Sequence, residues 1–189
     1  MKAEGPKQLL RTGGQTLLEH VIHQAAGSGL DELIVVLGHR AECIQESIGI
    51  STGTPLRFTF APDHAQGQSR ALRAGLLAAD ARAEAAAILL GDQPDLPPTT
   101  IDRAREAWLK QRPRFLRPEY TGAGGQNQPG HPVLICRKMW PRMMELDGDQ
   151  GARDIIGSHP DWLEALPMTG EAPTDIDRIE DWNAWLQAR

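Results

Sequence analysis

A carboxylate that directly follows a buried strand is the group in this chain best suited to chemistry. The apolar run 86–90 ends in Gly91 and Asp92. Ligands of open α/β sheets bind outside the carboxyl ends of the strands, so Asp92 is expected at a binding edge. Mg²⁺ commonly takes one or two carboxylates together with substrate phosphates. Asp92 is therefore predicted to hold Mg²⁺ beside a nucleotide. The alternative is a turn in which Asp92 only caps the following segment.

Two further carboxylates, Asp175 and Asp177, lie two residues apart with Ile176 between them. In an extended segment such a spacing puts both carboxylates on one side and Ile176 on the other, toward the core. This arrangement suits a second metal contact or a metal-bound water. The other reading is that Asp177 caps a helix that begins near Ile179, a role worth about 1 kcal/mol. The two readings are compatible.

Composition limits the class of protein. A chain of 189 residues is long enough for one domain with a sizeable core. The net charge of −5 argues against a general nucleic-acid binder. No apolar run approaches the roughly 20 residues of a membrane span, and the first residues lack the apolar core of a signal peptide. Cys43 and Cys136 match no metal spacing, which favours core thiols in a cytoplasmic protein.

Helical and strand patterns alternate along most of the chain. Residues 16–26 carry a helical apolar stripe, and the all-apolar run 33–37 is typical of a strand buried on both faces. Further helices are predicted at 41–48, 68–79, 98–110, 138–145, 151–158 and 179–187, and further strands at 56–60, 86–90, 115–118, 132–136 and 163–167. Residues 120–129 are predicted to form a loop. This alternation predicts a three-layer α/β fold with a mainly parallel sheet.

Seven short motifs follow one another in an order and spacing that together are specific. They are Gly5-Pro6-Lys7-Gln8-Leu9-Leu10, Val36-Leu37-Gly38-His39, Gly67-Gln68-Ser69, Gly91-Asp92-Gln93-Pro94, Gly130-His131-Pro132-Val133, Gly148-Asp149-Gln150-Gly151-Ala152-Arg153 and Asp175-Ile176-Asp177. With them the chain resembles, over nearly its whole length, the nucleotidyltransferases that attach a nucleotide to the molybdenum cofactor. The Gln93-Pro94 ending of the fourth motif favours the cytidylyl-transferring branch over the guanylyl-transferring one.

The resemblance implies a single Rossmann-like nucleotidyltransferase domain over residues 1–189. It also implies transfer of CMP from CTP to molybdopterin, with Mg²⁺ as the cofactor and release of pyrophosphate. The implied partners are CTP or another NTP, the molybdenum cofactor, and a molybdoenzyme as the final acceptor. Two alternatives stay open: a related transferase that uses GTP or another acceptor, and a non-catalytic protein that binds the molybdenum cofactor.

The resemblance also assigns residues to the nucleotide. Lys7 stands where the family has a lysine on the phosphates, although an exposed lysine is the common alternative. Gly67, Gln68 and Ser69 precede a helix whose free N–H groups suit a nucleotide, or serve only as its cap. Gln93 is placed beside the nucleotide or the pterin, with a plain turn role as the alternative. Lys7 and Asp92 are the catalytic residues in this assignment, and Asp92, Asp175 and Asp177 are the metal ligands.

On the acceptor side, the resemblance places His131 and Arg153 near the pterin substrate. His131 is expected to hydrogen-bond that substrate or to carry a proton, and a structural histidine is the alternative. Arg153 is expected to reach the substrate phosphate or to pair with Asp149.

The chain departs from the family at its start. Relatives begin with a strand and a Gly-rich loop whose backbone N–H groups cradle a triphosphate, and only six residues precede Lys7 here. We therefore expect the domain as given to lack this first strand and loop. The strand would lie in the middle of the sheet, so its two neighbours are expected to have unpaired backbone groups.

Overall fold

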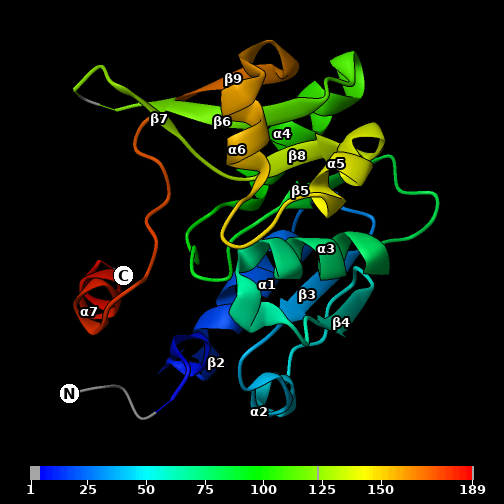
Figure 1. Cartoon of the computed structure of the whole chain (residues 1–189). Coiled ribbons are helices and arrows are strands. Elements are labelled where there is room, and N and C mark those ends of the chain that lie inside the picture. The colour runs from blue at the N-terminus through cyan, green and yellow to red at the C-terminus, as the bar shows by residue number, and fades with distance from the viewer. Residues whose placement is uncertain (1–4, 123, 189) are drawn as a thin grey trace.

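The computed structural model describes residues 5–122 and 124–188, in which strands lie between two layers of helices (Figure 1). One layer contains α3 (Gln68–Ala78), α5 (Trp140–Met144) and α6 (Ala152–Ser158), and the other contains α1 (Leu17–Ala26) and α4 (Pro98–Gln111). Each layer has its own apolar cluster: Leu76 and Met143 belong to the first, and Ile22 and Ile101 to the second. The expected α/β architecture is present.

The larger sheet is mixed, so the prediction of a mainly parallel sheet is not confirmed. β3 (Leu33–Leu37) pairs in parallel with β4 (Leu56–Phe60), with Leu33 opposite Leu56. A second sheet has the order β5 (Ala85–Ile88), β8 (Val133–Cys136), β6 (Phe115–Thr121) and β7 (Asn127–Pro129), and β9 (Leu163–Thr169) runs parallel to β6 on its other side. β8 runs antiparallel to both β5 and β6. It does so because the β6–β7 hairpin turns the chain back, which antiparallel strands allow with a short connection.

Two hairpins were not expected from the sequence. β6 continues to Thr121 and pairs with β7, so the predicted loop 120–129 contains strand residues at both ends. At the start of the chain, β1 (Arg11–Thr12) pairs with β2 (Gln15–Thr16). Gly13 and Gly14 connect them with φ of +57° and +85°, a backbone shape that glycine adopts readily and that two-residue hairpin turns favour. The Gly-Gly pair is the signal that could have predicted this hairpin.

The two sheets are not joined to each other. Among residues 5–122 and 124–188, β3 has ladder bonds only to β4, and β5 only to β8. The ends of β3 are buried, but Ile34, Val35 and Val36 are partly exposed. The prediction that this strand is buried on both faces therefore holds for its ends and not for its middle.

The C-terminal helix packs against the start of the chain. α7 (Ile179–Gln187) has the predicted bounds, and its Trp182 and Trp185 form one apolar cluster with Leu17 of α1 and Ile176. α1 itself begins at Thr16, whose side chain and that of Glu19 bond each other's backbone N–H groups. The remaining elements are α2 (Ala41–Ser47) and short 3₁₀ helices at Lys7–Leu9, His64–Gln66, Arg137–Met139 and Pro160–Trp162. Packing of α7 thus brings the segment before it beside Lys7.

Truncation of Trp182 tests this packing. Trp182 is 5% exposed and stacks on Trp185 with ring centroids 5.0 Å apart, so Trp182→Ala leaves a large cavity. We expect a loss of about 3–5 kcal/mol in the free energy of unfolding, measured by urea titration. Its neighbour Asn183 is exposed, and Asn183→Ala is expected to stay within about 0.5 kcal/mol of wild type. Equal losses in both variants would contradict the packing role of α7.

Candidate active site

A lysine ammonium lies between two carboxylates at the carboxyl side of β5. Lys7 Nζ is 2.7 Å from Asp92 Oδ2 and 2.8 Å from Asp177 Oδ1. Lys7 begins a short 3₁₀ helix, Asp92 lies in the turn after β5, and Asp177 lies just before α7. The structure therefore brings together three of the predicted site residues from the start, middle and end of the chain.

Asp177 does not cap the C-terminal helix. The carboxylate of Asp181 accepts the backbone N–H of Arg178 at 2.8 Å and that of Asp177 at 3.1 Å. Asp181 thus satisfies the two backbone donors just before α7, and Arg178 is the N-cap residue, so the reading of Asp177 as the cap is wrong. The side chain of Asp177 is left to contact Lys7.

Gln93 holds the carboxylate strap, our name for residues 173–177, against the turn after β5. It is 5% exposed and its Nε2 donates to Asp175 Oδ1 at 2.7 Å. The backbone N–H of Ile176 donates to the carbonyl of Asp92 at 2.9 Å. Ile176 is 3% exposed, as its predicted inward orientation requires. Gln93 therefore positions the strap, and Asp175 faces Gln93 while Asp177 faces Lys7.

His131 lies in the electrostatic field of the same carboxylates. Burial lowers the pKa of its imidazole below the usual value, and the positive charge of Arg117 acts in the same direction. Asp175 and Asp92 oppose this shift without cancelling it. The ring is consequently neutral at pH 7 and can both donate and accept a hydrogen bond. Arg117, on β6, is a neighbour that no sequence motif indicated.

The predicted nucleotide segment at the start of α3 contacts a loop of the chain itself. Ser69 N–H donates to the carbonyl of Gly148 at 3.1 Å, and Gln68 Nε2 donates to that of Asp149 at 2.5 Å. Gly67 has φ of +117°, and a Cβ there would lie 2.1 Å from the Gly148 carbonyl carbon. Only glycine fits this approach. The nucleotide roles of Gly67, Gln68 and Ser69 stay predictions.

Arg153 lies exposed on α6. Among the residues described, it forms no ion pair with Asp149. Its predicted contact with substrate stays a prediction.

The two carboxylates fit a divalent cation whose remaining ligands are supplied by phosphates. Within the described part of the chain, no group of three or more His, Cys, Asp or Glu side chains is gathered as a metal site, and Asp175 accepts a hydrogen bond from Gln93. However, Mg²⁺ usually takes only one or two protein carboxylates and fills its other positions with water and phosphate. Asp92 and Asp177 already hold one cation, the Lys7 ammonium. Asp92 Oδ1 is buried and has no hydrogen-bond partner there, so it is a second oxygen available to a metal.

The charges in this cluster support one another. Burial by itself lowers the pKa of the Lys7 ammonium, but its hydrogen bonds to Asp177 and Asp92 outweigh that effect and raise it. The same hydrogen bond from Lys7 lowers the pKa of the Asp177 carboxyl. The ion pair is therefore fully formed near neutral pH.

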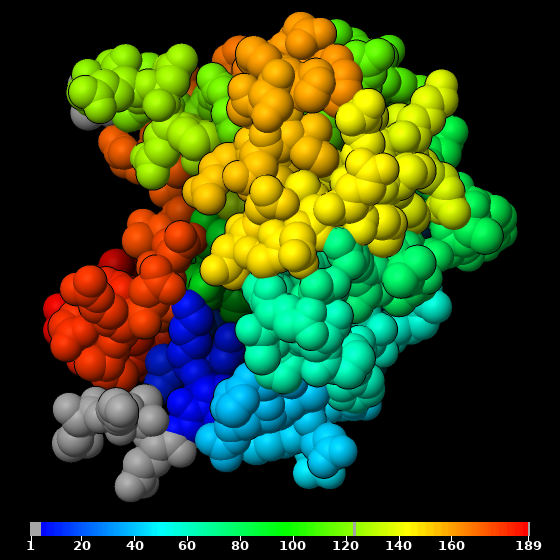
Figure 2. Space-filling model, viewed as in Figure 1, coloured from blue at the N-terminus to red at the C-terminus, as the bar shows by residue number. Residues whose placement is uncertain are grey.

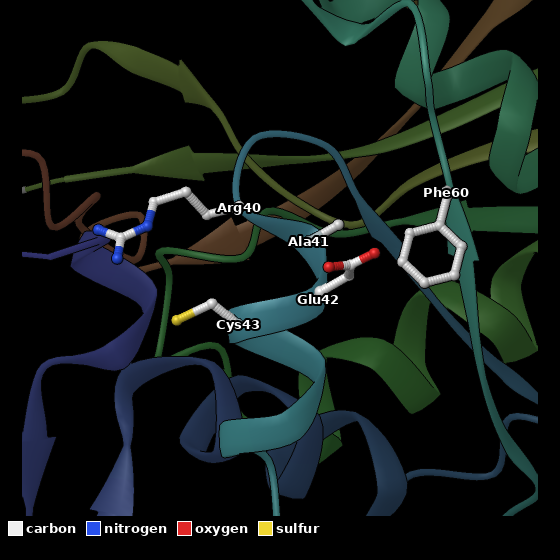
Figure 3. A pocket seen from close by; sticks show the side chains of 5 residues that line it. All are labelled: Arg40, Ala41, Glu42, Cys43 and Phe60. Carbon is white, nitrogen blue, oxygen red and sulfur yellow. The ribbon is translucent and has the colours of Figure 1, made fainter.

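The surface around the cluster is accessible. Figure 2 shows a recess between the blue N-terminal segment and the yellow loop that precedes α6, with green mid-chain atoms at its floor. A separate open hollow of about 510 Å³ lies at the carboxyl ends of β3 and β4 (Figure 3). It is lined by Arg40, Ala41, Glu42, Cys43 and Phe60. The hollow carries one charge of each sign and contains none of the site carboxylates.

A lysine and two carboxylates brought together beside β5 of an α/β fold are groups suited to phosphates and a cation. Residues 1–162 match the family described as the MobA-like NTP transferase domain. The chain belongs to this family. No helix in the described ranges is long and apolar enough to cross a membrane.

One named relative and several solved structures are similar to this chain. The chain is 29% identical over 182 residues to nicotine blue oxidoreductase of Paenarthrobacter nicotinovorans, a match that covers 93% of this chain and 85% of that protein. The crystal structure of Rv0371c from Mycobacterium tuberculosis H37Rv is similar at a TM-score of 0.81 and 25% identity, over 98% of this chain and 92% of that one. Rv0371c has also been crystallised as a complex with manganese; that structure is 27% identical, with a TM-score of 0.79, over 98% of this chain and 94% of that one. The 4-diphosphocytidyl-2C-methyl-D-erythritol synthase of Anaerococcus prevotii shares the fold at a TM-score of 0.74 and 16% identity, over 94% and 88% of the two chains.

Removal of Lys7 should give a stability difference that depends on pH. The raised pKa of Lys7 means that its contribution is present below pH 10.5 and is lost as the pH rises through the raised value. The lowered pKa of Asp177 means that its contribution is present above pH 3.8 and is lost as the pH falls. Lys7→Met is therefore expected to lose about 0.2–1 kcal/mol near neutral pH and less at both extremes. Urea titrations at several pH values measure this, with the exposed Lys138→Met as the control; a difference that does not change with pH contradicts the ion pair.

Proposed function

We propose that the protein transfers CMP from CTP to the molybdenum-bound pterin and releases pyrophosphate. A terminal phosphate oxygen of the pterin attacks the α-phosphorus of CTP, and the bond from that phosphorus to the bridging oxygen of the β-phosphate breaks. The electron pair leaves with pyrophosphate. The attacking group is already an anion, so no side-chain nucleophile is required. The observation that supports this proposal most directly is the pair of carboxylates Asp92 and Asp177, which faces one cation at the edge of the sheet.

Catalysis of this kind depends on alignment and on neutralisation of charge. A divalent cation bound between the carboxylates would neutralise charge on the leaving pyrophosphate. In this proposal Asp92 and Asp177 hold the cation and Lys7 contacts the nucleotide phosphates. Gln93 keeps the carboxylate strap in place through Asp175, and the neutral His131 hydrogen-bonds the acceptor.

An assay with several substrates distinguishes this activity from others that the same site could perform. A relative of the chain carries the name nicotine blue oxidoreductase, and solved neighbours include cytidylyl-transferring enzymes of other acceptors. The assay therefore compares CTP, GTP and ATP, each with and without molybdenum-loaded pterin, and follows oxidation of a reduced nicotinamide cofactor in parallel. Pyrophosphate release that requires CTP and the pterin supports the proposal. Binding of the pterin without any release favours a cofactor-binding protein.

Asp92→Asn separates catalysis from folding. The substitution keeps the shape of the side chain and removes the charge that a cation requires. We expect CTP-dependent pyrophosphate release to fall by at least about 10²-fold, with an unchanged circular dichroism spectrum. Asp95→Asn, three residues away, is the matched control and should keep near-normal turnover. Retention of activity by Asp92→Asn would remove the cation from the proposed mechanism.

The separate sheets suggest a second test. An extended segment that pairs with the open edges of β3 and β5 would join the sheets, and a Gly-rich loop after it would supply phosphate donors. We expect a chain extended at its N-terminus by a strand and loop of the family pattern to release pyrophosphate about 10²–10³ times faster and to unfold at higher urea. An extension of equal length made of Gly and Ser is the control. Equal rates for the two extended chains would mean that other groups of this chain hold the phosphates.

A further inference from the structure

The Lys7 ammonium occupies the point that a shared metal ion requires. Its nitrogen is 2.7 Å from an Asp92 oxygen and 2.8 Å from an Asp177 oxygen. Mg²⁺ binds carboxylate oxygens at about 2.0–2.1 Å, so a metal that takes these same two oxygens must lie close to where the nitrogen lies. Two cations cannot share that position. The ammonium and the metal are therefore alternative occupants of one site.

We propose that Lys7 is a resident counter-ion which a divalent cation displaces, and that the released ammonium then moves to the phosphates of the bound nucleotide. The last step rests on the proposed function, because it requires a nucleotide. The exchange itself requires only the metal and the two carboxylates. Lys7 thus acts twice, first as a placeholder for the metal and then as a phosphate ligand.

The surroundings of Lys7 permit this movement. The 3₁₀ helix Lys7–Leu9 has no buried residue, and the Lys7 side chain is about one-third exposed. A lysine head group sits on a flexible four-carbon stem, so it can leave the carboxylates without unfolding the core. The backbone beside the carboxylates, in contrast, is held: the carbonyl of Asp92 accepts the N–H of Ile176, and Ile176 is packed with α7.

The charges also favour an exchange. One ammonium leaves the two carboxylates with a net charge of −1, which a divalent cation would bring to zero. Asp92 Oδ1 is buried without a partner among the described residues, so it is a further oxygen that a bound metal could use. Metal alone must break two ion pairs to enter, whereas metal with nucleotide gives the ammonium new partners. Metal and nucleotide are therefore expected to strengthen each other's binding, and by the same factor.

The test measures Mn²⁺ binding to the full chain by calorimetry and by the electron paramagnetic resonance signal of free Mn²⁺, with no nucleotide present. Lys7→Met removes the competing ammonium and is expected to tighten Mn²⁺ binding roughly three- to tenfold. This fold-change corresponds to the free energy of one or two exposed ion pairs. Lys7→Arg keeps a cation at the carboxylates and should bind close to the wild type.

Arg178→Met is the matched control for charge. Arg178 lies next to Asp177 and influences it electrostatically, but it does not bridge the two carboxylates. We expect its removal to change Mn²⁺ affinity by less than about twofold. If Lys7→Met binds Mn²⁺ no more tightly than Arg178→Met, the exchange is overturned. Lys7→Gln repeats the measurement with a polar side chain should Lys7→Met fold poorly, as judged by circular dichroism.

Two further measurements separate this inference from the proposed function. Asp92→Asn should abolish Mn²⁺ binding; if it does not, or if no form of the protein binds Mn²⁺, the metal site and the exchange both fail. Addition of CTP should tighten Mn²⁺ binding in the wild type more than in Lys7→Met. Tighter Mn²⁺ binding by Lys7→Met with no effect of CTP would support the exchange and remove CTP as the nucleotide.

Discussion

Two carboxylates that face one point require a cation between them, and three distant parts of this chain combine to meet that requirement. Asp92 is presented by the turn after β5, Asp177 by the segment before α7, and Lys7 by the start of the described chain. The arrangement is strong enough to raise the pKa of the ammonium even though burial acts in the opposite direction. Much of the fold around it serves to hold these three groups in place.

The tryptophan cluster of α7 helps to position this charge cluster. Trp182 and Trp185 pack with Leu17 and Ile176, and aromatic side chains of this size dominate the energetics of small cores. Because Ile176 lies between Asp175 and Asp177, its burial fixes the side from which both carboxylates approach. Gln93 then selects one of them through its amide N–H. Asp177 is left free to face Lys7, so apolar packing and a single buried amide together determine which carboxylate joins the site.

The site is also open to ligands in a way that suits a transferase. Its carboxylates hold a partly exposed lysine, and a recess lies beside the N-terminal segment (Figure 2). The start of α3 is held by the loop at Gly148 and Asp149, so the binding region is bordered by chain segments that contact each other through backbone groups. Charged side chains, hydrogen-bond donors and open surface for a nucleotide with its cation therefore lie at one edge of the sheet.

The sequence by itself determined the order of the longer helices and strands, the position of Asp92 shortly after β5, and the inward turn of Ile176, but not the hairpins β1–β2 and β6–β7. These features depend on neighbours in the chain: apolar periodicity, glycines at element ends and alternation in an extended segment. The family resemblance assigned Lys7, Asp92 and Asp177 to one site, and these three lie together although 170 positions separate Lys7 from Asp177. The ligand contacts assigned to the other residues stay predictions. Only the tertiary structure decided that β8 runs antiparallel between β5 and β6, that Gln93 holds Asp175, and that Lys7 bridges two carboxylates. Strand direction and ion-pair geometry depend on how distant segments pack, and no local pattern encodes that.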